Sequence, residues 1–138
     1  MTTVAELPAG FADKVLSAQS TFRSVMDAMA RPGTVQRIVA AAGAPAVMMR
    51  GTAAIALTLL DHDTPVWLDP RMSETSDVAK WLKFHTGAPV IADSSICSFA
   101  LIGDAEALPG FDRFSFGTDE YPDRSTTVLL QEIGRAHV

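Results

Sequence analysis

The stretch GTAAIALTLLDHDTPVWL, residues 51–68, contains a helix signal, a turn signal and a strand signal in immediate succession. Thr52 is suited to cap a helix, and residues 53–60 are apolar on nearly every side, which predicts a largely buried helix. Residues 61–65 combine acids with Thr-Pro and end the helix, because proline cannot continue it. Residues 66–68, Val-Trp-Leu, follow as a short strand. A buried helix that leads directly into a strand predicts an α/β fold.

The sequence before this stretch predicts another helix and another strand. Asp13 is suited to cap the helix, and apolar residues then recur at spacings of three and four. The members of this stripe are Val15, Ala18, Phe22, Val25, Met26 and Met29. Arg31-Pro32-Gly33 ends the helix, and the β-branched alternation over residues 34–39 predicts a short strand. Residues 1–10 are expected to form a flexible arm.

The sequence after residue 68 continues the alternation of helices and strands. Ser73 or Ser76 is suited to cap a third helix, and Gly87 is suited to end it. The predicted apolar face of this helix consists of Val78, Trp81, Leu82 and His85. Residues 89–92, 95–102 and 125–131 have the apolar patterns of strands, whereas residues 103–124 form a long acidic segment rich in Gly and Pro. We therefore expect an α/β protein with helices layered on a mixed sheet.

Composition limits the classes of protein to which the chain can belong. It has 138 residues, of which 48% are hydrophobic and 20% charged, and this suits one globular domain. No apolar run reaches the roughly 18 residues of a membrane span, and the N-terminus lacks a basic and hydrophobic leader. The net charge of −5 argues against nucleic-acid binding, and the single cysteine, Cys97, excludes an internal disulfide. These features predict a cytoplasmic protein that binds neither a membrane nor nucleic acid.

Asp61, His62 and Asp63, with His85 further along, invite a catalytic or metal-binding interpretation. Carboxylates and imidazoles are common ligands of divalent cations. Three adjacent residues at a helix end point in different directions, however, and the HxH, HxxxH and ExxH spacings of metal sites are absent. The structural alternative is that Asp63 accepts backbone N–H bonds in a turn before Thr-Pro. We favour the turn, expect no metal, and keep Asp61, Asp63 and His85 as candidate catalytic residues.

Arginines in and after the first predicted helix suggest a second chemistry. Arg31, with the Pro-Gly that follows it, could present a guanidinium and backbone N–H groups to a phosphate, although a helix stop explains the same residues. Residues 1–50 carry a net charge of +2, against −7 for residues 51–138. An anion-binding module that uses Arg23, Arg31 and Arg37 therefore remains an alternative. The sequence contains no Walker A, GxGxxG or GxSxG motif, and Cys97 lies in an apolar pattern typical of a buried thiol.

Four phrases occur in an order and at a spacing that resemble one known family. They are FRSVMDAMARPG at 22–33, LTLLDHDTPVWL at 57–68, KFHTGAPV at 83–90 and TTVLLQ at 126–131. Together they resemble PhnH, the H subunit of the carbon–phosphorus lyase core complex. The resemblance implies a subunit that assists the formation of a ribose 1-phosphonate 5-triphosphate from a nucleoside triphosphate and a phosphonate, in phosphonate catabolism. It also implies a homodimer, docking with the G, I and J subunits, and a fold similar to pyridoxal-phosphate transferases without use of that cofactor.

The three lysines agree with the absence of a cofactor. Lys14, Lys80 and Lys83 all fall on predicted helices, where a solvated position is simpler than a Schiff base in an apolar pocket. The resemblance supplies no established catalytic residue. It marks a set of matched residues as fold or interface candidates, namely Arg23, Pro32, Gly33, Pro65, Trp67 and Pro89. A non-catalytic or assisting subunit is therefore the favoured function, with a stand-alone small-molecule enzyme or an anion-binding module as alternatives.

The resemblance also predicts how the chain is organised. Members of the family continue beyond the strand that corresponds to TTVLLQ, so we expect residues 11–131 to be a partial α/β domain that is incomplete at its C-terminus. Residues 132–138, EIGRAHV, match the translation of a common sequencing adapter. We therefore expect these last residues to be a non-native tail.

Overall fold

Three helices and three strands follow one another in the computed structural model, which describes residues 14–38 and 43–132. They are α1 (Lys14–Ala30), α2 (Arg50–Leu59), β1 (Val66–Leu68), α3 (Asp77–Thr86), β2 (Phe99–Ile102) and β3 (Thr127–Leu130). Short 3-10 helices occupy Ser94–Ile96, Ala105–Ala107, Phe111–Arg113 and Pro122–Arg124. The expected N-terminal arm, the Asp13 cap and nearly all of the expected tail lie outside the described residues.

The strands form a three-stranded sheet in the order β1-β2-β3, and both pairings are parallel. The α/β class is thus confirmed, but the expectation of a mixed sheet is wrong for these strands. The segment predicted as a strand over 89–92 adds only an isolated parallel bridge between Val90 and Val66. An isolated antiparallel bridge joins Phe116 to Ser125. Parallel strands require long connections, and here α3 and the 103–124 segment supply them.

Both faces of the sheet are covered at β1 and β2, which explains why these two strands are apolar throughout. Side chains alternate between the two faces along each strand. One face packs against α2 and α3, and its core includes Val66, Leu68 and Leu101. The other face is covered by the loop residue Phe114, which packs with Ala100 and Ile102. The molecule therefore has a helix layer, a sheet and a layer of loops with short 3-10 helices.

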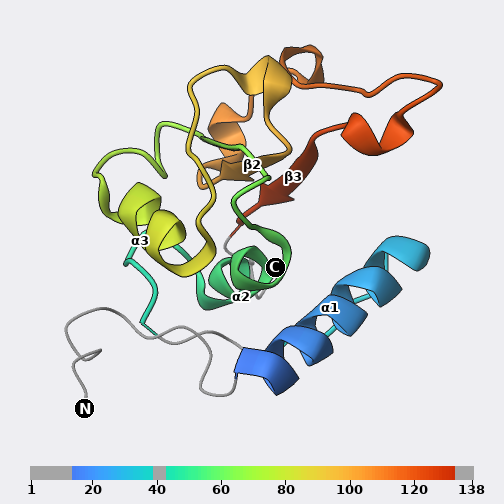
Figure 1. Cartoon of the computed structure of the whole chain (residues 1–138), viewed down its shortest axis with the longest axis vertical. Coiled ribbons are helices and arrows are strands. Elements are labelled where there is room, and N and C mark those ends of the chain that lie inside the picture. Colours follow the sequence, from blue (N-terminus) through green and yellow to red (C-terminus); the bar gives the residue numbers. More distant parts are fainter. Residues whose placement is uncertain (1–13, 39–42, 133–138) are drawn as a thin grey trace.

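Helix α2 lies between α1 and α3 and is the centre of the helix layer (Figure 1). Its alanines at 53, 54 and 56 are fully buried, because small side chains allow its neighbours to approach closely. The helix begins at Arg50 with Met49 as N-cap, so the prediction of Thr52 as the cap is wrong. Helix α3 begins after Ser76 and ends at Gly87 in a left-handed conformation, φ 77°, as the sequence indicated.

Helix α1 packs against α2 but buries less of its stripe than the sequence pattern suggested. Thr21 is fully buried, whereas Phe22 is 49% and Met29 62% exposed. The stop at residues 31–33 is confirmed, because Gly33 takes φ 92° and the N–H of Thr34 donates to the carbonyl of Arg31 at 3.2 Å. Residues 34–38 are not a strand, and residue 39 lies outside the described part. The β-branched alternation there has no neighbouring strand to pair with among the described residues.

The remaining predicted strands are shorter than their apolar patterns. Residues 94–96 form a 3-10 turn, so the strand predicted over 95–102 is restricted to β2. The strand predicted over 125–131 is confirmed as β3.

None of the helices within the described residues has the length and apolar character needed to cross a membrane.

Candidate functional site

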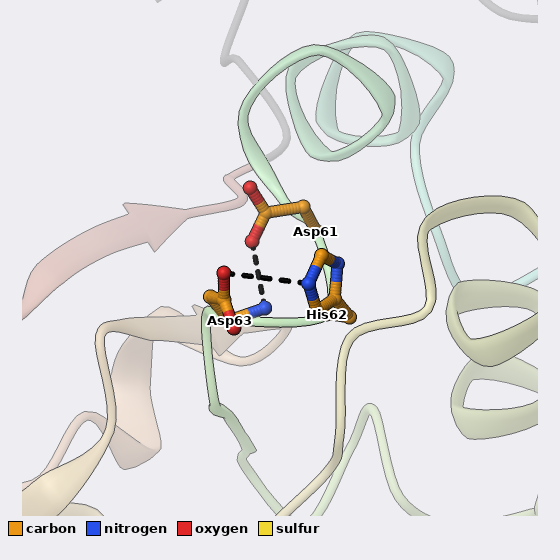
Figure 2. A group of neighbouring side chains, drawn as sticks. All are labelled: Asp61, His62 and Asp63. Carbon is orange, nitrogen blue, oxygen red and sulfur yellow. Dashed lines mark hydrogen bonds and ion pairs between the residues drawn. The ribbon is translucent and has the colours of Figure 1, made fainter.

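The Asp61-His62-Asp63 cluster forms the corner between α2 and β1, as Figure 2 shows. The carboxylate of Asp61 accepts the N–H of Asp63 at 2.8 Å, which defines an Asx turn. The hydroxyl of Thr64 donates to the carbonyl of Asp61 and accepts its N–H, both at 2.8 Å. The predicted turn is confirmed, but Asp61, and not Asp63, is the acceptor that closes it.

The side chains of His62 and Asp63 extend into solvent beside this turn. Their ion pair spans 3.4 Å, and the two side chains are 78% and 81% exposed. One ligand atom from each of Asp61, His62 and Asp63 lies within 4.8 Å of the others, which is close enough for a shared cation. All three residues are exposed, however, so water competes for each of these ligands. The geometry therefore supports a corner of the fold more directly than a metal site.

His85 is the last residue but one of α3, in its final turn and next to this corner. Its ring packs on Trp81 at 4.8 Å and on Phe84 at 4.9 Å between centroids. A Cβ at Gly87 would lie 3.4 Å from the Cβ of His62, so the end of α3 and the acidic corner are in contact. The candidate catalytic residues Asp61, Asp63 and His85 thus belong to neighbouring segments. Their catalytic role stays a prediction.

The structure reveals a buried carboxylate that sequence reasoning missed. Asp69 follows β1 directly and is fully buried. One carboxylate oxygen accepts the N–H of Met72 at 2.9 Å, and the other accepts the N–H groups of Gly103 and Asp104 at 3.0 Å. Asp69 therefore holds the ends of β1 and β2 together. The local signal was an Asp-Pro pair directly after a buried strand, which is typical of a turn.

Gln131 performs a similar role at the end of β3. Its side-chain oxygen accepts the N–H of Met49, the N-cap of α2, at 2.7 Å. Its side-chain nitrogen donates to the carbonyl of Val47 at 2.9 Å. The carboxyl ends of all three strands are therefore fixed by side chains that bond to distant backbone.

An open cleft of about 330 Å³ lies at this carboxyl edge of the sheet. Its walls include Met49, Arg71, Gly103, Glu106 and Gln131. A Cβ on Gly103 would lie 2.9 Å from the Cγ of Arg71, so glycine allows the arginine stem to cross the end of β2. Parallel sheets often bind ligands at this edge. The cleft combines a guanidinium with carboxylates and suits a polar ligand that carries both signs of charge.

The six fold or interface candidates divide into two groups. Three of them are partly buried and make contacts within the fold. The Pro65 carbonyl accepts the N–H of Ser98 at 2.8 Å, the Pro89 carbonyl accepts that of Val66 at 2.9 Å, and Trp67 meets Phe114 edge to face at 5.7 Å. The other three, Arg23, Pro32 and Gly33, are exposed on α1 and its terminal turn. Arg31 and Arg37 are also exposed, and the carbonyl of Arg37 accepts the hydroxyl of Ser24 at 2.8 Å.

The fold and its surface define a small α/β protein whose sheet edge carries an open polar cleft and whose helix α1 leaves apolar side chains in solvent. Residues 9–135 match the family model of the bacterial phosphonate metabolism protein PhnH, so the chain belongs to the PhnH family. It is 50% identical over 132 residues to the alpha-D-ribose 1-methylphosphonate 5-triphosphate synthase subunit PhnH of Rhizobium meliloti (strain 1021). The matched region covers 95% of this chain and 66% of that relative, so the chain spans just under two thirds of the relative's length.

Proposed function

We propose that the chain is an assisting subunit of the multisubunit enzyme that makes alpha-D-ribose 1-methylphosphonate 5-triphosphate during phosphonate catabolism. The observation that carries this proposal is the 50% identity to a subunit of that synthase along 95% of the chain. In the reaction a phosphonate displaces the base of a nucleoside triphosphate. The role of this chain is to complete the assembly that performs the displacement.

The geometry of the candidate catalytic residues favours an assisting role over a stand-alone enzyme. Asp61 uses its carboxylate to close a turn, and Asp63 pairs with His62 at the surface. A general acid or base works best where the surrounding protein excludes water and holds the group in a fixed position. The side chains of His62 and Asp63 are about four-fifths exposed, so the protein does not exclude water around them.

The same proposal includes the cell compartment in which the chain acts and the subunits with which it associates. The chain would act in the cytoplasm, with the G, I and J subunits of the carbon–phosphorus lyase system as partners and a second copy of itself in a homodimer. The exposed apolar side chains of α1 support association with another protein, because Phe22 and Met29 are each about half exposed or more. The fold would be similar to that of pyridoxal-phosphate transferases, and the protein would not use that cofactor.

Growth on methylphosphonate as the sole phosphorus source tests this function in a bacterium that lacks its own H subunit. The chain is expected to restore growth and to copurify with the G, I and J subunits. Asp63→Asn and His85→Asn are expected to restore growth as well as the unchanged chain, after a thermal melt has shown that both variants fold. Failure of the unchanged, folded chain to copurify would contradict the subunit role. Loss of growth in both folded variants would favour the stand-alone enzyme.

A further inference from the structure

A second depression in the surface runs along the outer side of α3 and is separate from the cleft at the sheet edge. We call it the α3 groove, and it has a volume of about 570 Å³. Its lining includes Lys80, Lys83, Phe84, Ala88, Pro89 and Val90. Most of these residues belong to the phrase KFHTGAPV at 83–90. Packing in the core accounts for some residues of this phrase but not for the exposed ones.

Two apolar side chains of the groove, Phe84 and Val90, are exposed, whereas its lining also includes the core residue Ala88. Helix α3 buries Val78, Trp81 and Leu82 on its inner face. Phe84 lies on the outer side and is 58% exposed, and Val90 is 39% exposed. Single exposed apolar residues are common, but Phe84 and Val90 line the same groove and together offer apolar surface to a partner.

The backbone at Val90 provides an unpaired sheet edge in the same groove. The N–H of Val66 donates to the carbonyl of Pro89, and the N–H of Ile91 donates to the carbonyl of Val66, both at 2.9 Å. In this parallel bridge the N–H and carbonyl of Val90 face away from β1. Within residues 14–38 and 43–132, neither group has a hydrogen-bond partner. An extended chain that lay along the groove could pair with them, as in recognition by strand addition.

The charge of the groove indicates the chemistry of its partner. Lys80 and Lys83 are three residues apart on α3 and therefore lie on one side of the helix. Neither ammonium forms an ion pair with another residue of the described part, and no acidic side chain lines the groove there. Residues 51–138, to which the groove belongs, carry a net charge of −7, so this positive site stands out from its surroundings. A carboxylate-bearing segment would complement it.

We propose that the α3 groove binds an extended acidic and apolar segment of another polypeptide in the synthase assembly. Apolar side chains of that segment would contact Phe84 and Val90, its carboxylates would pair with Lys80 and Lys83, and its backbone would pair with Val90. The proposal rests on the proposed function as a subunit. It places Pro89, which the family resemblance marked as an interface candidate, in the lining of the α3 groove.

Crosslinking within the assembly tests which segment occupies the groove. The chain is coexpressed with the G, I and J subunits and treated with a carbodiimide, which joins a lysine amine directly to a carboxylate. We expect amide crosslinks from Lys80 or Lys83 to aspartate or glutamate residues of one extended segment in a partner subunit.

We also expect the double variant Lys80→Glu with Lys83→Glu to weaken association with the partner subunits at least tenfold. The control double variant, Arg113→Glu with Arg124→Glu, is expected to leave this association within twofold. An assembly without these crosslinks, crosslinks to a second copy of this chain, or unchanged association of the lysine variant would overturn the proposal.

A peptide titration tests whether the α3 groove binds an acidic and apolar segment, and it does not need the assembly. If the assembly does not form, that result contradicts the proposed function but not the proposed role of the groove. The probe is a capped octapeptide of alternating valine and glutamate, with alternating valine and lysine as its control. In amide NMR spectra of the isolated chain, we expect shifts concentrated in residues 79–91 with the glutamate peptide. Val90→Pro, which removes the outward N–H, is expected to weaken binding at least tenfold relative to Val90→Ile. No localised shifts, equal binding of both peptides, or tighter binding of a single-stranded oligonucleotide at these residues would overturn the proposal.

Discussion

Asp69 connects the ends of β1 and β2 through its carboxylate. It is a fully buried carboxylate whose charge is balanced by three backbone N–H groups instead of a basic side chain. Charge-assisted hydrogen bonds of this kind are stronger than neutral ones. Two of the three donors come from residues 34 and 35 positions later, so the contact closes a long loop.

Asp69→Asn is expected to lower the free energy of unfolding by about 3 kcal/mol, because an amide NH2 would face a buried N–H on one side. Urea denaturation measures this change as a lower midpoint with an unchanged slope. Asp77→Asn is the matched control, since Asp77 is exposed, and it is expected to stay within about 0.5 kcal/mol. Equal midpoints for Asp69→Asn and the unchanged chain would contradict this role.

The free energy of unfolding of the protein is expected to depend on pH through the thiol of Cys97. Burial raises the pKa of the Cys97 thiol above its ordinary value of 9.0. Above that value the unfolded chain releases the proton while the folded chain keeps it, so the free energy of unfolding falls as the pH rises. Urea denaturation between pH 8 and pH 10 is expected to show a smaller loss of stability for Cys97→Ser than for the unchanged chain. The same loss in both proteins would show that the thiol does not cause it.

At the scale of residues, the sequence predicted local chemistry better than distant contacts. The acids and Thr-Pro of residues 61–65 indicated a corner, because an Asx turn needs only adjacent residues. The choice between Asp61 and Asp63 as acceptor depends on backbone direction, which the pattern does not specify. Asp69 could not be assigned because its partners, Gly103 and Asp104, are distant in sequence.

At the scale of elements, two glycines of the helix layer differ in the backbone conformation that their positions require. Gly87 ends α3 with φ 77°, a conformation that an alanine adopts at a cost of about 1 kcal/mol. Gly51 lies inside α2, and a Cβ there would be 3.5 Å from Ile38, an ordinary contact distance. The same substitution should therefore have opposite effects at these positions.

Gly87→Ala is expected to lower the free energy of unfolding by about 1 kcal/mol, and Gly51→Ala is expected to raise it by roughly 0.5 kcal/mol. Chemical denaturation of both variants measures the difference, and each serves as the control for the other. A decrease of equal size in both variants would show that loss of glycine itself, and not the left-handed C-cap, is responsible.

Gln131→Ala tests how β3 is attached to α2. The substitution leaves the N–H of Met49 and the carbonyl of Val47 without their partner, and a loss of about 2 kcal/mol is expected. Gln19→Ala, on the exposed side of α1, is the control and should change stability by less than about 0.5 kcal/mol. Hydrogen exchange of the Met49 amide should accelerate in the Gln131 variant alone, and protection equal to that of the unchanged chain would contradict the attachment.

The type of each buried element could be predicted from the sequence, whereas its exact boundaries could not. β1 and the end of α3 were correct because Val-Trp-Leu and Gly87 carry strong local signals. The predicted strand over 34–39 failed because a strand needs a neighbour, and β propensity alone does not supply one. The start of α2 was misplaced because its cap amide bonds to Gln131, which is 82 residues away.

At the scale of the whole molecule, exposed apolar surface occurs on α1 and in the α3 groove, while the acidic corner serves the fold. Phe22 and Met29 on α1 and Phe84 on α3 all remain substantially exposed in the single chain. Surfaces of this kind are typical of proteins that work in assemblies. The resemblance to a complex subunit could be found in the sequence, but the positions of these surfaces required the fold.

The most direct test of the assisting role is a ³¹P NMR assay of product formation from a nucleoside triphosphate and methylphosphonate. The chain alone, the partner subunits of the synthase alone, and the two together are compared at equal concentrations. The account predicts no ribose 1-methylphosphonate 5-triphosphate from the chain alone, and formation that requires or is strongly increased by the mixture. Turnover by the purified chain alone, abolished by Asp63→Asn or His85→Asn without loss of folding, would contradict it.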